Sequence, residues 1–98
     1  MTIRKQQNGT ELTLALEGRL DTTTSPELEK ELKASMDGAD SLVLDFSKLE
    51  YISSAGLRVL LSAHKAMAGK GGMTVANANE IVQEVFDVTG FSDILTLK

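Results

Sequence analysis

The sequence predicts an α/β fold: a single domain with a mixed sheet of four to five strands and about three helices packed against it. The chain has 98 residues, a length typical of one domain. Its hydrophobic content of 42% is sufficient for a small core. Short apolar runs alternate with amphipathic segments in the order β-β-α-β-α-β-α-β. This order favours an initial hairpin followed by parallel crossovers.

The first two strands are predicted to form a hairpin. Residues 2–7 are a weak strand, and Asn8-Gly9 is a strong turn signal because both turn positions favour positive φ. A second strand follows, in which Leu12, Leu14 and Leu16 alternate with other residues. This alternation predicts a strand with one face buried. Residues 18–24 are expected to form a loop.

The first helix is expected to begin near Thr24 or Ser25 and to end at Gly38. Pro26 fits the first turn of a helix, and Glu27 there complements the helix dipole. A narrow apolar stripe indicates a helix on the surface of the domain: Leu28, Leu32 and Met36.

Three strands and two helices are expected in the second half of the chain. Residues 42–44 are a continuous apolar run, typical of a central strand covered on both faces. The elements expected after it are a helix over residues 54–68, a strand over 73–76, a helix over about 79–89 and a strand over 94–97. Gly90 is expected to end the last helix, with Phe91 packing back on Phe86.

Composition and charge exclude several classes of function. The net charge is −4 with basic and acidic residues interspersed, so the chain lacks the basic face that nucleic-acid binding requires. It contains no Cys, which excludes disulfides and thiolate metal sites. No apolar run reaches the roughly 18 residues of a membrane span, and the first residues lack the apolar core of a signal peptide. We therefore expect a cytoplasmic protein with no nucleic-acid or membrane partner, and with neither cofactor nor metal.

The sequence lacks the residues that nucleophilic catalysis needs. Ser54 requires a base, and the only His, His64, is ten residues further along the predicted helix, about 15 Å away at ~1.5 Å per residue. His64 falls on the apolar side of that helix, which favours a packing role. Residues 69–72, Gly-Lys-Gly-Gly, are not a phosphate-binding loop, and a helix-to-strand turn explains them. Asp21 and Asp45 each follow an apolar strand and are expected at one edge of the sheet, where loop capping explains each as well as a functional role does.

The turn into the helix at residues 54–68 is the remaining candidate site. Ser53 fits the N-cap position, and Ser54 then falls at the first helical position with its hydroxyl directed outward. Gly56 adds no side chain to this first turn, so a partner can approach the backbone closely. A helix N-terminus favours an anion, including a phosphate. From these residues alone, ordinary capping explains a pair of serines at this place better than modification does.

The chain closely resembles the STAS domain family and, within it, the bacterial anti-sigma factor antagonists. Three motifs in matching order carry this resemblance over nearly the whole chain. They are Gly18-Arg19-Leu20-Asp21 after the second strand, Leu44-Asp45-Phe46-Ser47-Lys48-Leu49 followed by Tyr51-Ile52-Ser53-Ser54-Ala55-Gly56-Leu57, and Val85-Phe86-Asp87-Val88-Thr89-Gly90-Phe91 at the end of the last helix.

The resemblance implies that one serine is phosphorylated by a partner, an anti-sigma factor with serine kinase activity, and dephosphorylated by a serine phosphatase. Aligned by Gly56 and Leu57, that serine is Ser54. ATP and Mg²⁺ belong to the kinase in this family. Two features depart from the family. Ser53 stands where the family has Asp, which removes a carboxylate beside the acceptor and makes Ser53 a weak rival. The chain also stops at Lys98, where many members continue into a C-terminal helix.

We therefore predict a phosphorylation-controlled binding protein, not an enzyme, which binds its partner kinase until Ser54 is phosphorylated. The expected partner-binding residues lie around the turn and on a nearby loop: Asp21, Thr22, Thr23, Ser53, Gly56 and Arg58, with Lys65 further along the helix. Two alternatives remain open. One is a constitutive STAS scaffold or regulatory subunit of a lipid-transport or transporter complex, in which Ser54 is only a helix cap. The other is a small-molecule or nucleotide sensor.

Overall fold

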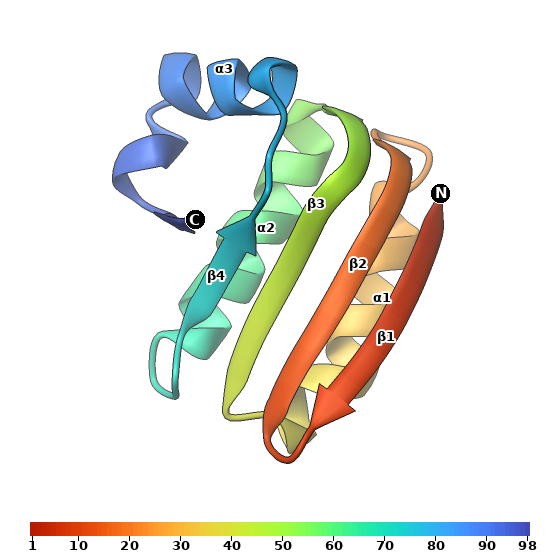
Figure 1. Cartoon of the computed structure of the whole chain (residues 1–98), viewed down its shortest axis with the longest axis vertical. Helices are drawn as coiled ribbons and strands as arrows, with labels where there is room; N and C mark the ends of the chain where they lie inside the picture. Colours follow the sequence, from red (N-terminus) through yellow and green to blue (C-terminus); the bar gives the residue numbers. More distant parts are fainter.

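The computed structural model describes all 98 residues and contains one five-stranded sheet, in the order β1-β2-β3-β4-β5 (Figure 1). The strands are β1 (Thr2–Asn8), β2 (Glu11–Leu20), β3 (Ser41–Ile52), β4 (Met73–Ala76) and β5 (Thr96–Leu97). β1 is antiparallel to β2, and every other pair of neighbours is parallel. The predicted mixed sheet, and the predicted order of strands and helices, are confirmed.

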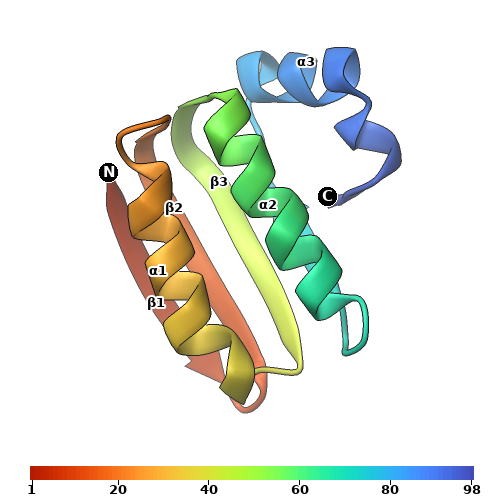
Figure 2. The same ribbon diagram turned by 180° about the vertical axis from the view of Figure 1, so that it is seen from behind.

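Two helices cover the same face of this sheet. α1 (Ser25–Ser35) and α2 (Ser54–Met67) lie side by side, behind the strands in Figure 1 and in front of them in Figure 2. Parallel crossovers are almost always right-handed, so two successive crossovers that advance in one direction place their helices on one face. The core between the layers contains 22 buried residues, among them Leu14 and Leu44 from adjacent strands.

The prediction that residues 42–44 are covered on both faces is wrong. Leu42 and Leu44 are buried, but Val43 between them is only half-buried. Both long helices lie on the other side, and Figure 1 looks onto this open face. β3 therefore alternates between a core side and an open side, as its side-chain period of two requires.

The turn between β1 and β2 lies one residue later than predicted. Asn8 still pairs with Glu11, so the loop consists of Gly9 and Thr10. Only Gly9 has a positive φ, 61°. This is the hairpin class that requires glycine at its first loop position alone.

β2 and β3 also continue into segments where the sequence predicts loops, ending at Leu20 and Ile52. Two register shifts in the β2–β3 pair accommodate polar residues without ending the strands. As a result Asp45 lies inside β3, paired with Ala15, whereas Asp21 follows the end of β2. The prediction that both carboxylates lie at one edge of the sheet is therefore wrong.

α3 (Glu80–Thr89) lies across the end of the sheet near the end of β3 (Figures 1 and 2). The Asn79 side chain caps it by accepting a hydrogen bond from the Val82 N–H at 2.8 Å. Gly90 ends it with φ 80°, as the sequence predicts. The ring of Phe86 stacks on Phe46 with centroids 6.3 Å apart. Short 3₁₀ turns follow α1 and α3, over Met36–Gly38 and Phe91–Asp93, so the final strand is shorter than residues 94–97.

Candidate functional site

The candidate site is the N-terminus of α2, which begins directly after β3 ends. Ser53 occupies the N-cap position with extended backbone, φ −103° and ψ 175°. Its N–H donates to the Leu20 carbonyl at 2.9 Å, and its own carbonyl accepts from the Leu57 N–H at 3.0 Å. The first bond ties the start of the helix to the end of β2, and the second closes the first turn of the helix itself.

The first three N–H groups of α2 have no acceptor within the protein. They belong to Ser54, Ala55 and Gly56. The first turn also contains no acidic side chain to offset the partial positive charge of the helix end. Ser54 is the first residue of the helix and is exposed. An anion on its side chain is therefore placed in a favourable field.

The two neighbouring serines differ in accessibility. The Ser53 hydroxyl oxygen is enclosed, has no hydrogen-bond partner, and does not cap the helix. Ser53 thus occupies the predicted N-cap position without making the capping bond that such serines usually make. Of the two serines, only Ser54 is exposed.

Gly56 has a role that the sequence analysis did not assign. It is buried, and a Cβ at this position would lie 2.8 Å from Leu20 Cγ and 2.8 Å from Ile52 Cγ1. The glycine therefore lets the first turn of α2 pack directly on the ends of β2 and β3. A side chain at this position would point into the core. The place of Gly56 among the partner-binding residues stays a prediction.

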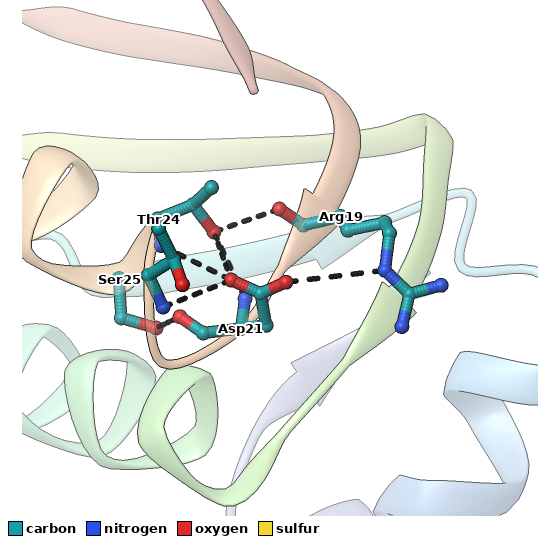
Figure 3. Close-up of polar contacts among 5 residues, drawn as sticks. Arg19, Asp21, Thr24 and Ser25 are labelled. Carbon is teal, nitrogen blue, oxygen red and sulfur yellow. Dashed lines mark hydrogen bonds and ion pairs between the residues drawn. The ribbon is translucent and has the colours of Figure 1, made fainter.

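The loop before α1 is organised by Asp21 (Figure 3). Asp21 Oδ1 accepts hydrogen bonds from the backbone N–H groups of Thr23 and Thr24, at 3.0 and 3.1 Å. The Asp21 carbonyl accepts from the N–H of Ser25 at 2.8 Å. The Thr24 bond is the main cause that lowers the pKa of Asp21 below its ordinary value. Asp21 therefore holds the loop in shape, whereas Thr22 and Thr23 beside it are exposed.

A cation sits beside this loop on the open face of the sheet. Arg19 Nε lies 3.9 Å from Asp21 Oδ2, and the Arg19 guanidinium lies over the Tyr51 ring, 4.4 Å from its centroid. Arg19 and Tyr51 are paired across β2 and β3. The two contacts hold the end of β2 against β3 and steady the loop that follows.

A shallow groove of about 220 Å³ connects this loop to α2. Its lining residues come from the loop and from both helices: Thr22, Ser25, Pro26, Glu29, Ala55, Arg58 and Val59. The structure thus brings Thr22 and Arg58 together next to Ser54. Lys65 is also exposed, seven residues after Arg58 and therefore two turns along the same side of α2.

The α1 side of this groove was missed by the sequence analysis. The missed residues are Ser25, Pro26 and Glu29. A signal for them was present in the element order, because two successive right-handed crossovers place α1 beside α2. That argument shows that the two helices are neighbours. The spacing of apolar residues along α1 then indicates which side of this helix faces the groove.

The other features that could carry a function lie outside this groove. His64 is half-buried on α2, ten residues after Ser54, and its enclosed Nδ1 has no partner, which fits a packing role. A second hollow, of about 190 Å³, is lined by residues that include Arg4, Asp45 and Lys48 and contains none of the predicted site residues. No cluster of three or more His, Asp or Glu side chains is arranged to hold a metal ion. None of the helices combines the length and apolar character that crossing a bilayer requires.

Comparison with known proteins gives consistent matches. The STAS domain family model matches residues 2–98. A Bordetella bronchiseptica protein described as an anti-sigma factor antagonist, BtrV, is 39% identical over 85 residues, which cover 85% of this chain and 73% of that protein. The crystal structure of an anti-sigma factor antagonist from Mycobacterium paratuberculosis has a TM-score of 0.89 at 24% identity and covers 98% of this chain and 83% of its own. The Bacillus cell fate determinant SpoIIAA in its phosphorylated form has a TM-score of 0.76 at 14% identity, with coverage of 99% and 91%.

These matches agree with the sheet order, with the helices on one face and with the predicted resemblance. The family model spans nearly the whole chain, and a relative above 30% identity covers most of it. The named relatives are described as anti-sigma factor antagonists, and such antagonists are regulatory proteins and not enzymes. The chain belongs to the STAS domain family.

Proposed function

We propose that this STAS domain is an anti-sigma factor antagonist that binds an anti-sigma factor with serine kinase activity and is switched off by phosphorylation at Ser54. The observation that carries the proposal is the contrast between the two serines. Ser54 is exposed beside three N–H groups without acceptors, whereas the Ser53 hydroxyl is enclosed. A kinase active site needs an accessible hydroxyl, and only Ser54 offers one at this turn.

The partner is proposed to cover the groove between α1 and α2. This surface combines the exposed loop residues Thr22 and Thr23 with Arg58, which forms no ion pair within the protein. An unpaired Arg beside a groove is well suited to anchor a partner carboxylate or carbonyl. Release of the sigma factor would follow when the anti-sigma factor is held in this complex.

Phosphorylation would weaken that complex in two ways. A phosphate adds about −1.5 to −2 charges and a strongly hydrated group to the contact surface. Arg58 follows Ser54 by four residues, so the two side chains are neighbours on α2, and the phosphate would attract the guanidinium away from the partner. The free protein tolerates the charge because it lies at a helix N-terminus. The phosphorylated SpoIIAA structure shares this fold, which supports a switch that keeps the fold intact.

The direct test is phosphorylation of the full chain by the candidate serine kinase encoded in the same genome. Parent protein, Ser54→Ala and Ser53→Ala are incubated with the kinase, ATP and Mg²⁺, and the phosphate is located by mass spectrometry. We expect Ser54→Ala to remain unmodified and Ser53→Ala to be modified at close to the parent rate. Subsequent removal of the phosphate by a serine phosphatase should restore binding.

Phosphorylation and binding measurements together separate a switch from a constitutive scaffold. Full labelling of Ser54→Ala would contradict Ser54 as the acceptor. Equal affinity of the parent and its phosphorylated form for the anti-sigma factor, measured by calorimetry, would contradict the switch and favour the scaffold interpretation.

A further inference from the structure

The most exposed large apolar side chains of the protein are confined to residues 81–94. Ile81 is 58% exposed, Val88 77% and Ile94 45%, and no other large hydrophobic residue is exposed to this degree. Ile81 and Val88 belong to α3, and Ile94 follows the short turn after it. Single exposed apolar residues are ordinary, but their concentration on one element indicates a contact surface.

The spacing along α3 places these residues on one side of the helix. Ile81 and Val88 are seven residues apart, which is two turns, and half-buried Val85 lies between them. The adjacent side of α3, formed by Val82 and Phe86, is fully buried in the core. The apolar sector of α3 is therefore wider than the part that the domain itself covers. We call the uncovered part, Ile81, Val85 and Val88, the α3 strip.

Acidic residues border the α3 strip on the side away from Val82 and Phe86. The charged residues of α3 are Glu80, Glu84 and Asp87, and the helix contains no basic residue. Glu80 and Glu84 form no ion pair. Asp87 instead accepts hydrogen bonds from Gln83 and Ser92. Two copies of such a surface would repel each other, so the charge disfavours a dimer formed through α3.

We propose that the α3 strip docks an amphipathic helix of a partner protein, with apolar residues facing the strip and Lys or Arg along its borders. Apolar contact with Ile81 and Val88 would supply the burial, and the acidic border would select a basic helix over an acidic one. The α3 strip shares no residue with Ser54 or with the groove between α1 and α2, so its test does not depend on the phosphorylation switch.

The test uses the full chain labelled with ¹⁵N and three synthetic peptides of about 18 residues, five helical turns each. The first has Leu on one side and Lys along both borders of that side. The second replaces each Lys with Glu, and the third is a scrambled form of the first. We expect the basic amphipathic peptide to shift the amide signals of residues 80–89 and 94, and to bind at least about tenfold more tightly than the other two.

Two pairs of substitutions separate apolar docking from general charge attraction. Ile81→Ser with Val88→Ser should weaken binding of the basic peptide by about tenfold or more. Glu80→Gln with Glu84→Gln should weaken it by about threefold or more, whereas Glu27→Gln with Glu50→Gln, a control that removes two charges elsewhere, should change it by less than about twofold. Glu27 is a matched control for Glu80, since each lies in the first turn of its helix.

Several outcomes would overturn the proposal. They are signal shifts centred outside α3, equal binding of the basic and scrambled peptides, and an equal effect of the two charge pairs. A concentration-dependent dimer in sedimentation that Ile81→Ser with Val88→Ser abolishes would show instead that a second copy of the chain covers the strip. Far-UV circular dichroism of each variant checks that α3 remains folded.

Discussion

At the scale of single residues, the structure separates two adjacent serines that look equivalent in the sequence. Their positions at the N-cap and first turn of α2 are predictable, because capping preferences are local. The outward direction of the Ser54 hydroxyl is predictable for the same reason. The enclosure of the Ser53 hydroxyl is not, since it depends on how the surrounding elements pack around it. Asp21 is a second example, because the sequence left loop capping and a functional role as alternatives for it. Its hydrogen bonds to its own loop fit the capping role.

Ser54→Asp should weaken binding of the anti-sigma factor strongly while leaving the fold intact. The carboxylate lies beside N–H groups without acceptors, so the free energy of unfolding should change by no more than ~1 kcal/mol. Affinity is measured by calorimetry and stability by urea denaturation. Loss of the cooperative unfolding transition would indicate that Ser54 is a structural cap and not a switch.

Arg58→Glu tests the same surface from the groove side. We expect it to weaken the complex by about 1–3 kcal/mol without unfolding the domain, as for a moderately important interface charge. Lys30→Glu, an equal charge change at an exposed position of α1, is the control and should have little effect. Unchanged affinity for both Arg58→Glu and Ser54→Asp would remove the groove from the proposed interface.

At the scale of secondary structure elements, the helices were predictable to within a few residues and the long strands were not. Helices carry local signals at both ends, such as Asn79 before α3 and Gly90 after it. β2 and β3 continue through polar residues because register shifts keep Leu49 and Ile52 in the core. Such irregular pairing is determined by the neighbouring strand, which a single-sequence pattern does not contain.

Gly56→Ala should destabilise the domain by about 1–3 kcal/mol, because the added methyl group would overlap Leu20 and Ile52 in a packed core. Gly69→Ala is the matched control. Nothing lies within 4 Å of a Cβ there and its φ is not positive, so the change should be neutral or slightly stabilising. Urea denaturation of both variants measures the difference, and equal stability would contradict the close packing of α2 on the strand ends.

At the scale of the whole molecule, three hydrogen-bonded carboxylates make stability depend on acidity. Asp21, Asp45 and Asp87 each have a lowered pKa, caused mainly by hydrogen bonds from Thr24, Asn77 and Ser92 respectively. Below the ordinary carboxyl pKa of about 4, the unfolded chain binds more protons than the folded one. The stabilisation is therefore complete above about pH 4 and is lost as pH falls through the folded pKa values.

The expected measurement is a free energy of unfolding that falls with decreasing pH below about 4. Asp45→Asn should flatten this decline, because it removes a carboxylate that accepts from Asn77 and Ser47. Glu50→Gln is the control, since Glu50 is exposed and accepts no side-chain hydrogen bond. An identical pH profile for parent and Asp45→Asn would contradict this assignment.

Fold class and topology were predictable because element order limits the arrangements that right-handed crossovers allow. Which faces of the sheet the helices cover was not predictable. Val43 belongs to an apolar run of the kind usual in strands covered on both faces, yet it lies on the open side. The groove beside Ser54 arises from the same topology. Its lining combines Thr22 and Glu29 with Arg58, residues that are distant in the sequence and meet only when α1 and α2 lie on one face.

The tight packing of Gly56 also bears on how quickly the proposed switch acts. Because the first turn of α2 packs directly against Leu20 and Ile52, we expect no slow rearrangement of this turn after a chemical change at Ser54. The lag between modification and release would then equal the lifetime of the weakened complex itself. The duration of the signal would be set by the turnover rates of the kinase and the phosphatase, and not by relaxation of this domain. Evolution would then change the speed of the switch through mutations in those two enzymes.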